Sequence, residues 1–448
     1  MPRQCARCAP EGARIPRGMI RGLSLVELLV AMAIGSIIAL ALTGAFVDSK
    51  ISYLREDQFA RIQENGRFVM STVAAHVRST GSLYCDSLAL QESRGGLSVK
   101  ACDLLSLGET SACDATIVDL ARDHVLGSTR PLGYDDSSID GPQSLIGIPA
   151  EGRSNIVERR LRGDVLVTWG ISGAGAYIAN APSLTEGDGL ATTLGLSQGN
   201  LALVSDCAGT DVFAVSGVCN GVVEHRANMS KGTGCEDEDQ DDVDNPGQVV
   251  NAMDSLSRAY NWQPVDRRTA SAPRYKAQVF PFRYQAFYIC CIDTRDGSLQ
   301  TGTGVDRCRT DPDRYRPSFC TWELGSGNRS QSVVLNVADM RVTYTGDLDG
   351  DGQIDFTADD DDPVPTASWV TSINAWPGVS AAKIELLVAS DNDHLRATAG
   401  AATPSKASWP PTTADDRLGN GMPADRRLYE RFVTNVALRA RTPWYISP

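Results

Sequence analysis

The chain has 448 residues, with 42 Lys and Arg against 55 Asp and Glu, which gives a formal charge of −13 at pH 7. This acidity argues against a general nucleic-acid-binding protein, because such proteins usually carry a basic patch or stripe. The length allows one large globular domain or two ordinary ones.

A basic flank and a long apolar run open the sequence. Residues 1–22 hold five arginines and one glutamate, and residues 23–47 hold one ionisable side chain, Glu27. A helix needs about 20 apolar residues to cross the hydrocarbon layer of a bilayer, and a basic flank stays on the cytoplasmic side. We therefore predict a single membrane-spanning helix over 23–47, with residues 1–22 on the cytoplasmic side and the chain after residue 47 in the periplasm. A carboxylate inside such a span costs roughly 2.5–3.5 kcal/mol at a helix centre, so Glu27 is a functional candidate. The alternative is an ordinary signal anchor with Glu27 near its end.

The junction between flank and span resembles the type IV prepilin signature, with Gly22 followed by Leu23-Ser24-Leu25-Val26-Glu27. The resemblance implies peptidase cleavage between Gly22 and Leu23, and methylation of the new N-terminal Leu23. Residues 1–22 are then a processed leader, for which Met19 is an alternative start. The family most often has Phe at the first mature position, so Leu23 is a small departure. Cleavage would place a positive amine four residues before Glu27. A charge pair in a dry helix bundle enforces register between subunits, because leaving either member unpaired is costly.

Residues 48–81 are predicted to continue the helix with one apolar stripe, because apolar residues recur at intervals of mostly three to five. The stripe consists of Ile51, Leu54, Phe59, Ile62, Val69, Val73 and Val77. The segment 61–68 resembles the corresponding part of the PilW family of minor pilins. In pilins the first half of this helix spans the membrane and the second half packs on the globular head, here residues 82–448.

The cysteine count indicates an oxidising compartment. Ten cysteines lie beyond the leader, and an even number after an export signal predicts disulfides. They are Cys85, Cys102, Cys113, Cys207, Cys219, Cys235, Cys290, Cys291, Cys308 and Cys320. The short separations of Cys102/Cys113, Cys207/Cys219 and Cys308/Cys320 would suit small closed loops, and the adjacent Cys290 and Cys291 are expected to take different partners.

Strand signals occupy much of the remaining chain, so we expect an α+β fold in which the long helix packs on a disulfide-bonded head with antiparallel sheet. Runs rich in β-branched and aromatic residues between Gly, Asn or Asp mark these strands. The predicted strand regions are 164–169, 200–207, 211–215, 283–293, 332–345, 379–390 and 426–441. The stretch 203–213 and the last two regions also resemble PilW proteins.

A loop at 346–355 carries alternating acidic residues with glycine. Asp347, Asp349, Asp351, Gln353 and Asp355 match ligand positions one, three, five, seven and nine of an EF-hand-type calcium loop, and Gly352 matches its turn glycine. Ala358 stands where that loop has its bidentate Glu. The candidate substitute is the neighbouring Asp359, with Asp360, Asp361 and Asp362 as alternatives. The alternative is an acidic turn that joins two strands. A second acidic run, at 235–244, reads as a solvated loop.

No catalytic constellation stands out, and we predict that the protein is not an enzyme. The sequence lacks H-E-x-x-H and the phosphate-binding G-x-x-x-x-G-K-[ST] motif. Its single G-x-S-x-G, at 195–199, is followed by a predicted strand, whereas a nucleophile elbow is followed by a helix. The four histidines are far apart in the chain. A membrane-anchored periplasmic hydrolase is the remote alternative.

The resemblance implies a minor pilin that joins other minor pilins in a complex that primes type IV pilus growth, near the pilus tip. Its expected partners are minor and major pilins, the prepilin peptidase and methylase, and a tip adhesin. No cofactor is required by this function, with Ca²⁺ as the candidate ion. The expected location is the bacterial inner membrane and then the pilus at the cell surface. A minor pseudopilin of type II secretion is the closer alternative, because the prepilin motif is common to both.

Overall fold

The computed structural model describes residues 24–84, 97–101, 126, 130–145, 147–178, 190–191, 194–219, 221–225, 256–260, 276–311, 314–325, 330–361, 363–391 and 427–438. The chain divides into two compact units, Met1–Asp57 and Gln58–Pro448. Gly22, Leu23 and the acidic run 235–244 lie outside the described residues.

Helix α1 (Leu25–Ser79) is the longest element and belongs to both units. All of its buried residues lie at or after Gln58: Gln58, Ile62, Gly66, Val69, Met70, Val73, Ala74 and Val77. The helix ends where Gly81 adopts φ +80°, a conformation that glycine takes without strain. The predicted stripe is correct from Ile62 onwards, but Phe59 is 41 % exposed, and Ile51 and Leu54 are also exposed.

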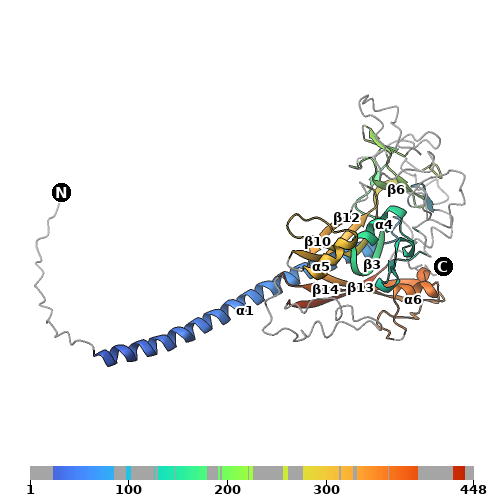
Figure 1. Cartoon of the computed structure of the whole chain (residues 1–448). Coiled ribbons are helices and arrows are strands. Elements are labelled where there is room, and N and C mark those ends of the chain that lie inside the picture. The colour runs from blue at the N-terminus through green and yellow to red at the C-terminus, as the bar shows by residue number, and fades with distance from the viewer. Residues whose placement is uncertain are drawn as a thin grey trace, which may run out of the picture. The chain divides into compact units, whose positions relative to one another are not determined.

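A nine-stranded sheet forms the larger part of the head (Figure 1). Its central strand is β10 (Gln278–Asp293), which pairs antiparallel with β3 (Arg160–Ile171), β4 (Ala176–Tyr177), β6 (Leu201–Ser205) and β11 (Tyr315–Glu323). The outer strands are β1 (Leu97–Val99), β2 (Gly133–Tyr134), β7 (Thr210–Ala214) and β12 (Ser330–Leu335). Among the described strands only β1 and β7 pair in parallel, so the expectation of antiparallel sheet is confirmed.

Two smaller sheets complete the described strands. One consists of β13 (Val337–Gly346), β14 (Val379–Ala389) and β15 (Tyr429–Ala437), and the other of β5 (Leu190–Ala191), β8 (Gly217–Cys219) and β9 (Val222–Glu224). The region 332–345 contains two strands in different sheets, because Asn336 at φ +64° breaks the run between β12 and β13.

Short helices lie between the strands. They are α4 (Ala150–Arg159), α5 (Arg307–Thr310) and α6 (Ala367–Ser372), with 3-10 turns η1 (Asp136–Ser138), η2 (Pro142–Ser144), η3 (Gly302–Asp306) and η4 (Trp376–Gly378).

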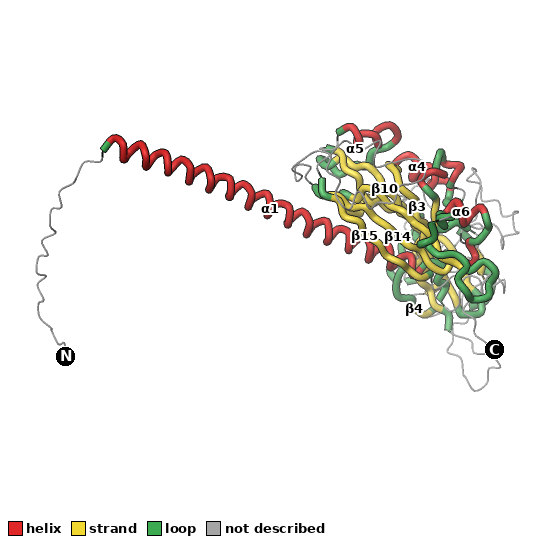
Figure 2. Tube along the Cα trace, turned by 90° about the horizontal axis from the view of Figure 1, so that it is seen from below, coloured by secondary structure: helices red, strands yellow, loops and turns green. Residues whose placement is uncertain are grey.

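The central strand β10 is buried on both of its faces, and a different core lies against each face. On one side, Phe287 and Ile289 share a core with Val73 of α1 and with Ile384 and Leu386 of β14. On the other side, a second core joins Tyr284 and Tyr288 to Trp322 of β11 and Ile156 of α4. Figure 2 shows the strands of the large sheet and of the β13–β15 sheet gathered in one head. The part of α1 after Asp57 is thus an internal element of the head.

A buried carboxylate joins the two main sheets. Asp164 of β3 accepts hydrogen bonds from the backbone N–H of Asp136 (2.9 Å) and from that of Val342 in β13 (2.8 Å). Burial, and after it the negative charge of the neighbouring Asp135, raise the pKa of Asp164 to about 8. Asp135 in turn accepts from the first two amides of α6, Ala367 and Ser368. The sheets are therefore connected through polar contacts as well as through the apolar core.

Candidate functional site

The start of α1 carries a reciprocal cap. The Ser24 backbone N–H donates to Glu27 Oε2 (3.0 Å), and the Glu27 N–H donates to Ser24 Oγ (3.2 Å). This is a capping box, in which two otherwise unpaired helix-end amides find acceptors. Its signal, Ser followed three residues later by Glu, is present in the sequence. The geometry holds the Glu27 carboxylate against the backbone of the second residue after the predicted cleavage site.

The helix segment that follows this cap is exposed and strongly apolar. An 18-residue window in α1 has a mean hydropathy of 2.5, and none of that window is buried inside the structure. By length and composition the helix can cross a membrane. Leu25, Leu40 and Phe46 are each at least 70 % exposed, so the apolar surface needs another environment, either lipid or other subunits.

A polar contact marks the beginning of the docked segment of α1, which we define as Gln58–Ser79. Gln58 is 5 % exposed, and its Oε1 accepts a hydrogen bond from the backbone N–H of Asp391 (2.9 Å). Arg61 approaches the Asp391 carboxylate at 3.8 Å, and Asn336 and Arg316 also hydrogen-bond to Asp391. The hydrophobic periodicity could not reveal this contact, because its partners are more than 330 residues apart.

Gly66 explains one feature of the PilW-like segment 61–68. A Cβ added to Gly66 would lie 2.3 Å from the ring of Phe432 in β15. The helix can approach the last strand this closely because glycine has no side chain at the contact. A glycine within a helical pattern usually has a packing or functional reason, and here the reason is the Phe432 ring.

Two disulfides connect β10 to its neighbours, one within the large sheet and one to a short helix. Cys290 bonds to Cys320 of β11, and Cys291 bonds to Cys308 of α5. The prediction that the adjacent pair takes different partners is confirmed, because successive strand residues point to opposite faces. The suggested Cys308/Cys320 loop is wrong, since each bonds to β10. Cys207 is also disulfide-bonded. Cys85, Cys102, Cys113 and Cys235 lie outside the described residues, and the structure describes only the backbone of Cys219.

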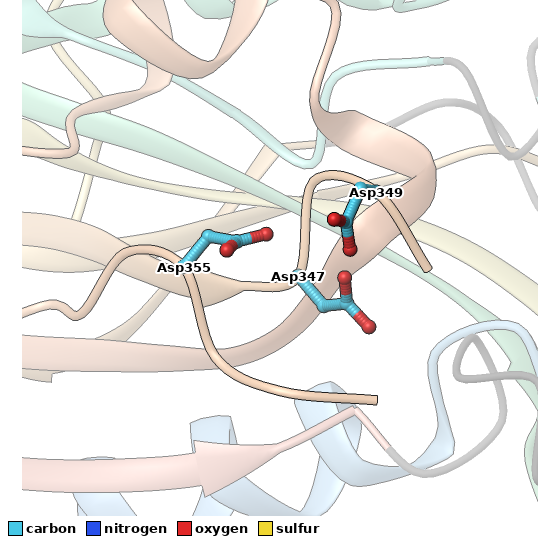
Figure 3. Close-up of side chains that lie close together, drawn as sticks. All are labelled: Asp347, Asp349 and Asp355. Carbon is cyan, nitrogen blue, oxygen red and sulfur yellow. The ribbon is translucent and has the colours of Figure 1, made fainter. Parts of the chain in front are cut away.

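The acidic loop brings three of its predicted ligands together. Asp347, Asp349 and Asp355 each place a carboxylate oxygen within 4.8 Å of the others (Figure 3). The antiparallel bridge between Gly346 and Phe356 closes the loop at its base. Backbone amides also serve these carboxylates: Asp347 accepts from Gly350 and Gly352, and Asp355 accepts from Leu348.

The other predicted ligands have different neighbours. Asp351 accepts from the backbone and side chain of Gln353, and Asp359 forms an ion pair with Lys383 at 2.8 Å. Three convergent carboxylates fit a hard cation, which prefers oxygen ligands. Asp359 would have to leave Lys383 before it could join them.

The residues considered for catalysis do not converge in the described part of the chain. Ser197 of the G-x-S-x-G segment lies in a turn directly before β6, and its backbone N–H donates to Asn200 Oδ1 (2.9 Å). His225 is buried against Phe213, His76 lies on α1, and the other two histidines lie outside the described residues. The element that follows Ser197 is strand β6 and not a helix, so the described residues around Ser197 do not form a nucleophile elbow.

Comparison with known proteins gives two family matches. Residues 307–440 match the family model described as Type IV Pilus-assembly protein W, and residues 17–43 match the prokaryotic N-terminal methylation motif. A solved type IV-like pilin from Thermus thermophilus aligns at 18 % identity over 36 % of this chain and 80 % of its own. The TM-score of 0.17 is too low to establish a shared fold. No curated protein matches the sequence. The two matches confirm the resemblance to PilW-type minor pilins.

Proposed function

We propose that this chain, which resembles PilW-type minor pilins in its two family matches, is a minor pilin that joins other minor pilins in a complex that primes pilus growth near the pilus tip. The observation that carries the proposal is the division of α1. Its segment before Gln58 has no buried residue and includes the apolar span, whereas the docked segment belongs to the core of the head. Such a protein can rest in the membrane before assembly and present the same apolar surface to other subunits afterwards.

Glu27 has the central role in this proposal. Cleavage after Gly22 would create an amine at Leu23, next to the Ser24 amide that Glu27 already accepts from. In an assembled bundle the carboxylate would exchange this local contact for the amine of another subunit. An unpaired charge in a dry bundle is costly, so the pair selects one axial register.

Intact mass and N-terminal sequencing of the protein from membranes, with and without the host's prepilin peptidase, test the processing step. The expected mature chain begins at methylated Leu23, and only when the peptidase is present. A chain left uncut, or cut elsewhere, would contradict the pilin pathway. The priming role is tested separately by deleting the gene, where an unchanged number of pili per cell would contradict it. Co-purification of other minor pilins with the wild-type protein tests the partner set.

The acidic loop is proposed to bind Ca²⁺ and so to stabilise the connection between β13 and α6. The convergence of Asp347, Asp349 and Asp355 supports this proposal. When bound, the cation would offset the repulsion among the three carboxylates. Calorimetric titration of the purified protein with Ca²⁺, with Asp349→Asn as the variant, tests it, and equal heats for both proteins would contradict it.

A further inference from the structure

A cavity of about 310 Å³ lies where the end of α1 meets strands β3 and β10. Its polar lining includes His76 of α1, Thr168 of β3, and Arg283 and Gln285 of β10, together with the hydroxyls of Ser79 and Ser172. The Ser79 hydroxyl already donates to the backbone carbonyl of His76. The register explains the grouping, because Gln285 lies opposite Thr168 on the neighbouring strand. Arg283 and Gln285 are two residues apart on one strand, so both side chains point to the face that α1 covers.

Gln285 contributes a buried acceptor without a donor. Its side chain is 5 % exposed, and its Nε2 donates to Glu323 Oε2 at 3.1 Å. A carboxylate can only accept hydrogen bonds, so the amide cannot be turned over, and Oε1 must face away from Glu323. No hydrogen bond from the described residues reaches this oxygen. A buried polar atom of this kind costs free energy, and such atoms are rare in folded proteins.

Other polar groups around the cavity can also form further hydrogen bonds. The Arg283 Nε lies 3.2 Å from Glu323 Oε1, and the two Nη atoms of Arg283 form no hydrogen bond with a described residue. Within the same part of the chain the His76 ring nitrogens and the Thr168 hydroxyl have no hydrogen-bond partner, although the His76 ring contacts Phe287 at 5.4 Å. Burial and Arg283 lower the pKa of His76, so the ring is neutral at pH 7 and offers one donor and one acceptor.

The balance of donors and acceptors selects the class of ligand. A carboxylate carries no donor for Gln285 Oε1, and an ammonium carries no acceptor for Arg283. Glu323 already balances the charge of Arg283, so the site favours a neutral group. A single amide cannot satisfy four open groups on three elements, whereas neighbouring hydroxyls each carry a donor and an acceptor.

We infer that this cavity binds a neutral polyhydroxylated ligand of the saccharide class. In this arrangement one hydroxyl donates to Gln285 Oε1 and a neighbouring hydroxyl accepts from an Arg283 Nη. His76 and Thr168 flank the ligand from the helix and from β3. The site lies in the head and is independent of the processing and assembly roles of the helix.

The test uses the full chain in a detergent without sugar groups, such as lauryldimethylamine oxide. Binding of methyl glucoside, methyl galactoside and methyl mannoside is measured by saturation-transfer NMR, with acetate, methylammonium and acetamide as single-group probes. We expect at least one glycoside to bind saturably and the three small probes not to compete. Gln285→Leu should weaken that binding at least about tenfold, which is one hydrogen bond at about 1.4 kcal/mol.

Thermal unfolding separates binding from folding. Gln285→Leu removes the unpaired oxygen, so its unfolding midpoint without ligand should equal or exceed that of the wild type. Gln331→Leu, an exposed glutamine on β12, is the matched control and should bind normally. If Gln285→Leu lowers the unfolding midpoint, Arg283→Met is used as the test variant in its place. The Arg283 side chain is half-exposed, and this variant should show the same loss of affinity.

Three results would overturn the inference. One is the failure of all three glycosides to bind, and another is undiminished binding by Gln285→Leu or its replacement Arg283→Met. The third is competition by acetamide at the affinity of the glycoside, which would assign the cavity to an amide side chain of a protein partner.

Discussion

The two parts of helix α1 belong to one continuous helix but meet different surroundings. Leu25–Asp57 contains no buried residue, and within it the apolar side chains of residues 25–47 face all directions. Gln58–Ser79 buries one stripe against the sheets, with Ile62, Val69 and Val73 each at most 1 % exposed. A helix that is apolar all round suits lipid or a subunit bundle, whereas an amphipathic helix packs on a core. Assembly and folding are therefore expected to depend on different residues of the same helix.

Glu27→Gln should have the largest effect of the variants considered, and it should reduce incorporation into pili without changing the stability of the head. Breaking a buried charge pair costs about 3–5 kcal/mol, so incorporation into pili should fall more than about tenfold. The unfolding midpoint of the head should stay the same. Quantitative immunoblots of sheared pili and of membranes measure the two pools. Glu64→Gln, an exposed glutamate of the docked segment, is the control, and equal incorporation of both variants would contradict the role of Glu27.

Gly66→Leu is expected to destabilise the head by about 3 kcal/mol, because overpacking a close contact forces neighbouring groups apart. The Phe432 ring occupies the space that any side chain at Gly66 would need. Gly44 gives a matched comparison on the same helix, since a Cβ there meets nothing within 4 Å. Chemical denaturation of both leucine variants measures the difference. Equal stabilities would show that the docked segment is not packed as described.

Asp164→Asn should lower stability by about 2 kcal/mol at pH 5, because one of two buried amides loses its acceptor. The raised pKa of Asp164, about 8, means that the folded protein holds this proton more tightly than the unfolded chain. The contribution of protonated Asp164 to the free energy of unfolding is therefore full below about pH 4 and is lost as the pH rises from about 4 to 8. Asparagine does not titrate, so the difference between the two proteins should shrink with rising pH. Denaturation series from pH 5 to 8 measure it, with exposed Asp361→Asn as control.

Ca²⁺ should stabilise the head modestly. A ligand at ten times its dissociation constant adds about 1.4 kcal/mol to the free energy of unfolding. Asp347→Asn should abolish the gain, whereas Asp360→Asn, outside the three-carboxylate cluster, should keep it. Differential scanning calorimetry with Ca²⁺ and with a chelator makes the comparison. An equal gain in the Asp347→Asn protein would place the ion elsewhere.

Gln58→Ala should give the smallest change, about 1 kcal/mol, since it removes a single hydrogen bond to the Asp391 amide. The effect should be local, with faster amide exchange at Asp391 and little change deeper in the docked segment. Gln63→Ala, which is only half-buried, is the control. Hydrogen-exchange mass spectrometry compares the two. Identical exchange would mean that the docked segment is held by the apolar stripe alone.

Local patterns in the sequence were sufficient for much of the fold. The length and hydropathy of α1, and its stripe from Ile62 onwards, follow from helical periodicity. In β14, Ile384 and Leu386 face the main core while Leu387 faces a separate cluster, as alternation along a strand predicts. The separate partners of Cys290 and Cys291 follow from the same alternation, and the convergence of Asp347, Asp349 and Asp355 follows from their spacing in one short loop.

Contacts between distant segments were decided only by the tertiary structure. Three such contacts join residues that are far apart in the sequence and unrelated by helix or strand periodicity. They are the disulfides of Cys308 and Cys320, the packing of the Phe432 ring on Gly66, and the hydrogen bonds of Asp164 to Asp136 and Val342. The cavity beside Gln285 likewise depends on the register of β3 against β10 and on where α1 ends. Sequence periodicity states which face of an element is buried, because side-chain direction is a local property. Which element covers that face depends on how the whole chain packs, so it appears only in the folded protein.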